Sequence, residues 1–244
     1  MALTARHIGY CQRRHRLGYR STRGSTLTGL SFSEYLSQNR TEIIFRTQQH
    51  ALLSFLCILI AAFLGLIIAI AVYRSNARTN FTISTAAVVF TLPSVALFGF
   101  LTSIVGYNLM AVFPVVVAYA MLPIVRNGIV GLQSADPAVL DAARGMGVGS
   151  FRMLWQIRLP IAWPVILAGV RVSAQLTVGV VAIAAFVTTV GLGEYGYSAL
   201  DNLGSVNTKN QAIVCIVFVA AVALVFDAVF VVIRRFTTPR GTRA

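Results

Sequence analysis

The chain has 244 residues, of which 57% are hydrophobic and only 11% are charged. An ordinary soluble domain has about 25% charged residues, so this composition argues against a soluble globular protein. Twenty Lys and Arg residues against seven Asp and Glu give a net charge of +13. Most of the arginines flank apolar segments, which is typical of membrane topology rather than of nucleic-acid binding. The three cysteines and three histidines are scattered, so we expect no disulfide framework, no metal site and no cofactor.

The first 48 residues differ from the rest of the chain. Residues 1–29 are polar and rich in arginine and lack the apolar stretch of a signal peptide, so we expect a disordered basic arm. Residues 30–48 mix apolar and polar side chains. This pattern predicts a short amphipathic helix that lies at the membrane interface.

Five longer apolar segments follow, each near the length that an α-helix needs to cross roughly 30 Å of hydrocarbon. They cover residues 51–73, 82–105, 108–125, 161–190 and 212–233. The sequence therefore predicts an all-α membrane protein with one transmembrane domain, residues 49–235, and a tail, residues 236–244. The fourth segment is too long for one straight crossing, so we expect its helix to end near residue 185, before an irregular loop.

The basic residues on the connections indicate which side of the membrane each connection faces. In a five-helix alternation, the connections of one side carry ten arginines, and the opposite ones contribute Lys209 alone. The ten are Arg74, Arg78, Arg126, Arg144, Arg152, Arg158, Arg234, Arg235, Arg240 and Arg243. By the positive-inside rule, the loop 127–160 and the C-terminus are cytoplasmic. An odd number of crossings then places the N-terminus outside, where Arg40 and Arg46 contradict the same rule.

The long loop at residues 127–160 has a helical pattern of its own. Asp136 followed by Pro137 is typical of a helix N-cap with proline in the first position, and an alanine-rich run continues from it. Three glycines then predict the end of that helix: Gly145, Gly147 and Gly149. A second apolar pattern follows, and we expect it to stop at Pro160. The loop is thus predicted to form two helices joined by a glycine turn, with a small-residue face that lets another protein approach.

The same loop contains a spaced motif. Its members are Asp141, Ala142, Ala143, Gly147, Ile157, Leu159 and Pro160. The motif resembles the Glu-Ala-Ala coupling loop of the permease subunits of binding-protein-dependent ABC importers, and every spacing of the family pattern is met. The sole departure is Asp141, whose side chain is one methylene shorter than the family's Glu. An interfacial hairpin without a partner explains the alanines but not the spacing of the glycine and the Leu-Pro pair.

The resemblance implies that this loop, including Gly145, docks on a cytoplasmic ATPase and passes its movement to the spanning helices. The chain has no P-loop of its own, because its one lysine, Lys209, follows no glycine-rich lead. Residues 191–196 fit a dinucleotide-binding spacing, but they follow a membrane helix and open no βαβ unit. The resemblance therefore implies a non-catalytic, five-helix permease of the small methionine-permease-like type. Its implied partners are ATPase subunits, a second permease copy, identical or not, and an extracytoplasmic solute-binding protein.

Softer motifs across residues 32–240 are similar to the permeases that import glycine betaine, carnitine and choline. They are Gln49-His50, residues 91–97, residues 122–127, residues 168–171, residues 191–193 and Asp227. The resemblance implies import of a small osmoprotectant across a bacterial cell membrane and places the aromatic cage for its methyl groups on the binding protein. Import of an amino acid such as methionine, ion-driven secondary transport and a purely structural scaffold stay open as alternatives.

Two further groups of residues are candidates for function. Pro93 interrupts the second apolar segment, and Thr91 and Ser94 beside it offer hydroxyl groups, so this stretch either kinks the helix or also lines the solute path. Arg171 and Asp227 lie within apolar segments, where a charge ordinarily needs a partner or water. A structural ion pair, separate snorkelling to the interface and contact with the solute are all open for these two residues.

Overall fold

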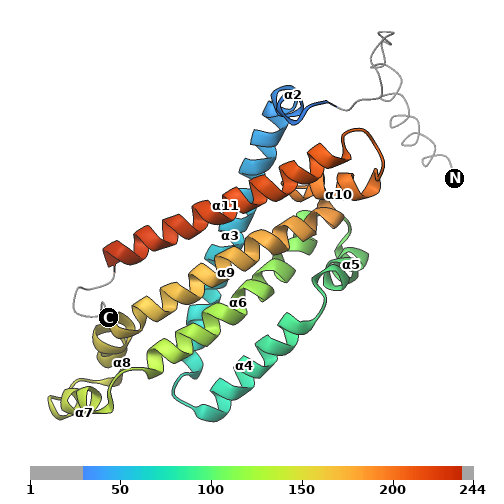
Figure 1. Ribbon diagram of the computed structural model, residues 1–244. Helices are drawn as coiled ribbons and strands as arrows, with labels where there is room; N and C mark the ends of the chain where they lie inside the picture. Colours follow the sequence, from blue (N-terminus) through green and yellow to red (C-terminus); the bar gives the residue numbers. More distant parts are fainter. Residues whose placement is uncertain (1–29, 238–244) are drawn as a thin grey trace, which may run out of the picture.

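The computed structural model describes residues 30–237, all of whose regular elements are helices (Figure 1). Four helical runs are long and apolar enough to cross a membrane. They are α3 (Arg40–Val72), α6 (Leu109–Gln133), the run Ser150–Thr188 that ends in α9 (Leu159–Thr188), and α11 (Thr208–Thr237). A bent pair, α4 (Asn76–Thr91) and α5 (Ser94–Val105), gives up to five crossings if it counts as one span. The predicted all-α membrane fold is confirmed.

Helices α3, α6 and α9 form the centre of the bundle, and small residues let them approach closely. A Cβ on Gly128 of α6 would lie 2.9 Å from the Cβ of Ala69 in α3, and one on Gly169 of α9 would lie 2.6 Å from the Cβ of Asn127. Lipid tails are as apolar as the side chains, so close packing and interhelical hydrogen bonds hold such helices together. One of these bonds runs from the Ser173 hydroxyl to the Ala120 carbonyl at 2.8 Å.

Helices α4 and α11 lie at opposite edges of this bundle (Figure 1). Thr79 is the one buried residue of α4, and α11 buries only Asn210, Val214 and Val222. Most of the surface of both helices is therefore left for lipid or for partner subunits.

The predicted interfacial segment 30–48 is divided between two helices. Helix α2 (Phe32–Gln38) begins with a capping box in which the Ser31 amide donates to the Glu34 carboxylate at 3.0 Å. A hydrogen bond from the Ser31 hydroxyl lowers the pKa of Glu34 below its usual value. From Arg40 onward the chain belongs to α3, so the helix that contains the predicted segment 51–73 begins well before residue 51. Arg46 pairs with Glu42 at 2.6 Å, so its charge is compensated at this end of the molecule.

Three other boundaries differ from those predicted. The second segment is not one kinked helix, because α4 and α5 meet at an angle of 86°. Helix α6 does not end near residue 125 but continues to Gln133. The stretch after α9, expected to be irregular, contains helix α10 (Gly193–Asp201). The predicted arm 1–29 and the tail from residue 238 onward lie outside the described residues.

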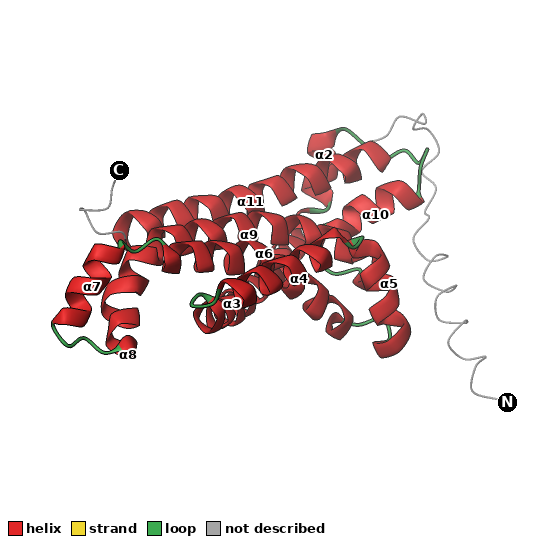
Figure 2. Ribbon diagram, turned by 90° about the horizontal axis from the view of Figure 1, so that it is seen from below, coloured by secondary structure: helices red, strands yellow, loops and turns green. Residues whose placement is uncertain are grey.

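The helices have two distinct ends. Helices α7 (Pro137–Gly145) and α8 (Ser150–Met153) project from one end of the bundle, and α2, α5 and α10 lie at the other (Figure 2). The bundle thus holds the α7–α8 segment away from the rest of the molecule at the end where the arginine-rich connections gather.

Candidate functional site

The candidate coupling element is a helical hairpin at residues 134–158, which we call the hairpin. It comprises α7, the glycine turn, α8 and η1 (Leu154–Arg158), a π-helical turn. Asp136 is the N-cap of α7, and its Oδ1 accepts from the Ala138 amide at 2.8 Å. Pro137 occupies the first turn, where its missing N–H costs nothing. The residues 127–133 that we assigned to this loop belong to α6 instead, so the hairpin is shorter than predicted.

Gly147 terminates α7 by adopting a left-handed conformation, with φ of +78°. The Gly147 amide bonds to the Arg144 carbonyl at 2.9 Å, and the Val148 amide bonds to the Ala143 carbonyl at 3.0 Å. These two bonds form a Schellman motif, which satisfies the last free carbonyls of the helix. No atom lies within 4 Å of a Cβ built on Gly147, so its backbone conformation, not lack of space, favours glycine here.

The hairpin has a packed inner face and an exposed outer face. Leu140 and Ala143 of α7 pack against Met153, together with Ala135, in a small separate core. Asp141 and Ala142 point away from this core and are exposed. Three large apolar side chains are exposed as well: Met146 at 77%, Phe151 at 76% and Trp155 at 51%. The outer face therefore combines small, acidic and apolar groups that another protein can cover.

The sequence predicts that Pro160 stops the second helix of the hairpin, but the structure has no stop there. Helix α8, η1 and α9 follow one another without a break from Ser150 to Thr188, and Pro160 lies in the first turn of α9. In a regular α-helix the proline ring would clash with the carbonyl four residues earlier, and the wider π turn just before it relieves that crowding. Leu159 and Ile157 of the motif are half-buried in this continuous run. The hairpin is thus joined directly to a spanning helix.

A junction around Tyr73 ties the hairpin to the bundle, and the sequence reasoning missed it. Gln133 donates to the Tyr73 carbonyl at 2.8 Å, and Arg158 donates to the Leu132 carbonyl at 2.6 Å. The Tyr73 ring lies 5.5 Å from the Arg74 guanidinium and 5.3 Å from that of Arg158. The sequence did contain one signal for this junction, because Tyr73 is an aromatic residue next to an arginine at the end of an apolar segment.

The break between α4 and α5 contains the predicted residues Thr91, Pro93 and Ser94. The Thr91 hydroxyl donates back to the Val88 carbonyl at 2.7 Å. The Leu92 carbonyl, which the break leaves without a helical partner, accepts a hydrogen bond from the Tyr119 hydroxyl of α6. Both Thr91 and Pro93 are exposed. The hydrogen bond from Tyr119 therefore supports the break, and the surface of the break is exposed. Tyr119 was not among the residues that the sequence suggested.

The structure brings Arg171 of α9 and Asp227 of α11 together. The Arg171 Nε and Nη2 atoms lie 2.6 and 2.8 Å from the two oxygens of Asp227, a bidentate pairing. Gln175 donates to the same carboxylate at 2.6 Å. This is the arrangement of the structural ion pair among our alternatives. Gln175 was missed, although its position one turn after Arg171 in an apolar segment places both on one helix face.

These features do not form one site. The hairpin lies at one end of the bundle, while the α4–α5 break and the α9–α11 ion pair lie toward opposite edges (Figure 1). Among residues 30–237, no three His, Cys, Asp or Glu side chains are grouped to hold a metal ion. The described residues thus form a multi-helix bundle of membrane-spanning length with a protruding, partly apolar hairpin at one end.

The chain belongs to the family described as binding-protein-dependent transport system inner membrane component, whose model matches residues 36–238. It is therefore a multi-pass inner-membrane permease subunit of an ABC importer, the non-catalytic transmembrane component. The prediction drawn from the spaced motif is confirmed at this level.

Similar proteins come from several bacteria. A glycine betaine/carnitine/choline transport system permease protein of Bacillus subtilis is 26% identical, over 85% of this chain and 94% of that protein. An osmoprotectant import permease protein of Salmonella typhimurium is 30% identical, over 86% of this chain and 98% of that protein. The fold resembles that of the MetNI methionine ABC transporter in an inward-facing conformation, with a TM-score of 0.69 and 21% identity over 81% of this chain and 96% of that one.

Proposed function

We propose that this permease imports a small osmoprotectant, such as glycine betaine or another quaternary ammonium compound, which an extracytoplasmic binding protein delivers. The names of the relatives in Bacillus subtilis and Salmonella typhimurium support this solute class. The importer family supports the energy source, a separate ATPase. A permanently charged or zwitterionic solute is costly to move through hydrocarbon, so it needs a water-accessible path between helices.

The outer face of the hairpin is the proposed docking surface for that ATPase, and it is the observation that carries the proposal. Met146, Phe151 and Trp155 of the hairpin are exposed, and so are Asp141 and Ala142. The Schellman motif and the small core around Leu140 make the hairpin a compact unit. Because η1 joins it to α9 without a break, movement of the ATPase passes to the central bundle as a rigid-body displacement.

Helix α4 is the proposed lining of the solute path, facing a second permease copy. Asn80, Ser84, Ala87 and Thr91 follow one another at intervals of four, three and four residues, so they share one helix face. The three polar members of this face are exposed in the single chain. Polar groups are costly against lipid, whereas a water-filled path or a partner helix satisfies them. The α4–α5 break with Thr91, Pro93 and Ser94 continues this face.

Solute uptake tests the proposed substrate. The chain is produced with its neighbouring ATPase and binding protein in a bacterium that lacks its own osmoprotectant and methionine uptake, and labelled solutes are added. We expect glycine betaine or choline to accumulate only when all three components are present. Uptake of methionine alone would overturn the osmoprotectant assignment. Uptake by the permease alone in an ion gradient would overturn the ATP-driven mechanism.

Removal of the exposed aromatic groups tests the docking surface. Phe151→Ser combined with Trp155→Ser should reduce co-purification of the ATPase and uptake by at least tenfold, while the amount of inserted permease is unchanged. Leu203→Ser is the matched control, because Leu203 is 75% exposed but lies beyond α10, at the opposite end of the molecule. Retained ATPase association in the double variant would count against docking on this face.

A further inference from the structure

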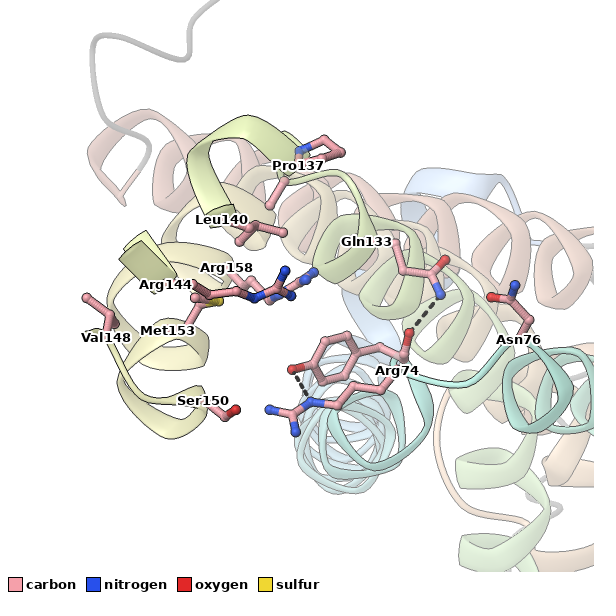
Figure 3. A pocket seen from close by; sticks show the side chains of 12 residues that line it. Arg74, Asn76, Gln133, Pro137, Leu140, Arg144, Val148, Ser150, Met153 and Arg158 are labelled. Atoms are coloured by element: carbon pink, nitrogen blue, oxygen red, sulfur yellow. Dashed lines mark hydrogen bonds between the residues drawn. The ribbon is translucent and has the colours of Figure 1, made fainter. Parts of the chain in front are cut away.

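A cavity of about 570 Å³ separates the hairpin from the ends of α3 and α6 (Figure 3). Its walls come from α7, from the start of α8, from η1, and from the turn that joins α3 to α4. It lies on the inner side of the hairpin, and Arg144 of its wall pairs with Asp141 of the proposed docking surface at 2.7 Å. The cavity therefore touches both the hairpin and the central bundle.

Three arginines from three different elements line this cavity. They are Arg74 after α3, Arg144 on α7 and Arg158 on η1. In Figure 3 the side chains of Arg144 and Arg158 extend toward each other, and Arg74 reaches toward Ser150 across the opening. No aspartate or glutamate is among the lining residues. Asp141 pairs with Arg144 at 2.7 Å, and within residues 30–237 neither Arg74 nor Arg158 forms a salt bridge.

The positions of these arginines leave most of their hydrogen-bonding capacity for a ligand. Arg74 donates through Nε to the Tyr73 hydroxyl at 2.9 Å, and Arg158 donates through one terminal nitrogen to the Leu132 carbonyl at 2.6 Å. A guanidinium group has five N–H donors in a planar fork. The observed bonds anchor Arg74 and Arg158 and leave further donors, together with the Ser150 hydroxyl, around the cavity. Arg144 donates to the Asp141 carboxylate through one terminal nitrogen and keeps its other N–H groups.

Convergence of like charges in a concave site favours an anion. The walls concentrate the positive potential, and the forked guanidinium groups match the oxygen atoms of a phosphate. The cavity lies where α3 and α6 end, next to Tyr73 and Gln133, and these are the ends of membrane-spanning helices. A phosphate bound at the ends of these helices would lie at the level of the lipid headgroups. Because the arginine-rich end faces the cytoplasm by the positive-inside rule, that layer is the cytoplasmic leaflet, which carries anionic lipids in many membranes.

We propose that this cavity binds the phosphate group of an anionic phospholipid, which bridges the hairpin and the bundle. Arg74 contacts the phosphate from the bundle side, while Arg144 and Arg158 contact it from the hairpin side. The bound headgroup offsets the charges of Arg74 and Arg158, which form no salt bridge among the described residues, and adds to the compensation that Asp141 gives Arg144. It also fixes the distance between α7 and the α3–α4 turn. The lipid composition of the membrane then changes how tightly the position of the hairpin is coupled to that of the bundle.

Lipid binding to the purified full-length chain tests this inference without requiring transport. The chain is titrated with phosphatidylglycerol or phosphatidylcholine in zwitterionic detergent, and the bound lipids are counted by native mass spectrometry. We expect tighter binding of phosphatidylglycerol, because the choline group of phosphatidylcholine is repelled. Arg74→Gln and Arg144→Gln should each weaken phosphatidylglycerol binding about fivefold, and the double variant about twentyfold, through loss of charge-assisted hydrogen bonds.

Arg152→Gln is the matched control, because it removes the same charge from the same hairpin but is not part of the cavity wall. We expect its phosphatidylglycerol affinity to stay within twofold of the original. An equal loss in this control, or no loss in the double variant, would overturn the proposal. Displacement of the lipid by millimolar inorganic phosphate would assign the cavity to a free phosphate instead. If the arginine variants bind phosphatidylglycerol as the original chain does but associate more weakly with the ATPase, the three arginines contact an acidic protein surface instead.

Discussion

Glycines occur both in the helix bundle and in the hairpin, but different physical constraints act on them. In the bundle, Gly128 and Gly169 lie where a single added carbon would meet a neighbouring helix at under 3 Å. In the hairpin, no atom lies within 4 Å of a Cβ built on Gly145, Gly147 or Gly149. Glycine in the bundle therefore sets the distance between helices, whereas Gly147 in the hairpin sets the direction in which the chain leaves α7.

The ion pairs of the bundle and of the hairpin also differ, because one joins separate helices and the other lies within a single helix. Arg171 and Asp227 join two separate helices, and their side chains are 37% and 22% exposed. Asp141 and Arg144 lie within one helix turn of the hairpin, and their side chains are 70% and 64% exposed. The bundle is thus held by contacts between elements, and the hairpin by local backbone chemistry. This difference fits the roles that we propose for the bundle as the solute path and for the hairpin as a docking element.

The largest effect is expected for Gly169→Ala. The new methyl group would lie 2.6 Å from the Asn127 Cβ and 2.8 Å from the Pro123 carbonyl, so α6 and α9 must separate. Overpacking of this kind costs about 3 kcal/mol. Thermal unfolding in nanodiscs and the yield of monodisperse protein measure the loss. Gly179→Ala in the same helix is the control, because nothing lies within 4 Å of its Cβ, and an equal loss there would contradict the close-contact explanation.

Reversal of one charge in the α9–α11 pair should also reduce folded protein severalfold. Asp227→Arg places two guanidinium groups side by side between α9 and α11, within helices that span the membrane. The combined exchange Arg171→Asp with Asp227→Arg restores opposite charges. We therefore expect it to recover most of the extractable, monodisperse permease in size-exclusion chromatography. Absence of any recovery would show that the pair does not join the two helices.

A smaller effect is expected for Gly147→Ala, and it should be confined to the hairpin. Holding a residue with a Cβ at a φ of +78° costs about 1 to 2 kcal/mol, which weakens the Schellman motif. We expect membrane insertion and the unfolding temperature of the bundle to be retained, while uptake and ATPase association fall. Gly145→Ala is the control at the last position of α7, where alanine favours the helix. Equal uptake in both variants would contradict the role of this turn.

The sequence predicted best those features that local chemistry determines. Asp136 caps α7 and Gly147 ends it, as their side chains and conformational preferences indicate. The pairing of Arg171 with Asp227 was one of three alternatives, because a charge inside the membrane needs a partner and few were available. The spaced motif identified the importer family because its spacing is set by this local hairpin structure.

The features that were wrong or missed depend on contacts between distant elements. Arg126 and Asn127 suggested the end of a helix, but α6 continues because Ile129 and Leu132 are buried in the core beside α3 and α9. Pro93 predicted a kink, but the 86° break also relies on the Tyr119 hydroxyl from another helix. Neither burial nor a partner hydroxyl is visible in a local pattern. Tertiary packing therefore determines where α6 ends and how sharply α4 and α5 are bent.

The smallest effect on stability is expected for Asp141→Asn. An exposed pair three residues apart contributes less than about 0.5 kcal/mol, so the unfolding temperature should stay within experimental error. If the Asp141 carboxylate contacts the ATPase, co-purification of the ATPase and uptake should nevertheless fall. The comparison between these two measurements separates a folding role from a docking role. Because Asp141 is the one residue that departs from the family's Glu-Ala-Ala pattern, Asp141→Glu should retain ATPase association if the negative charge is what the partner recognises.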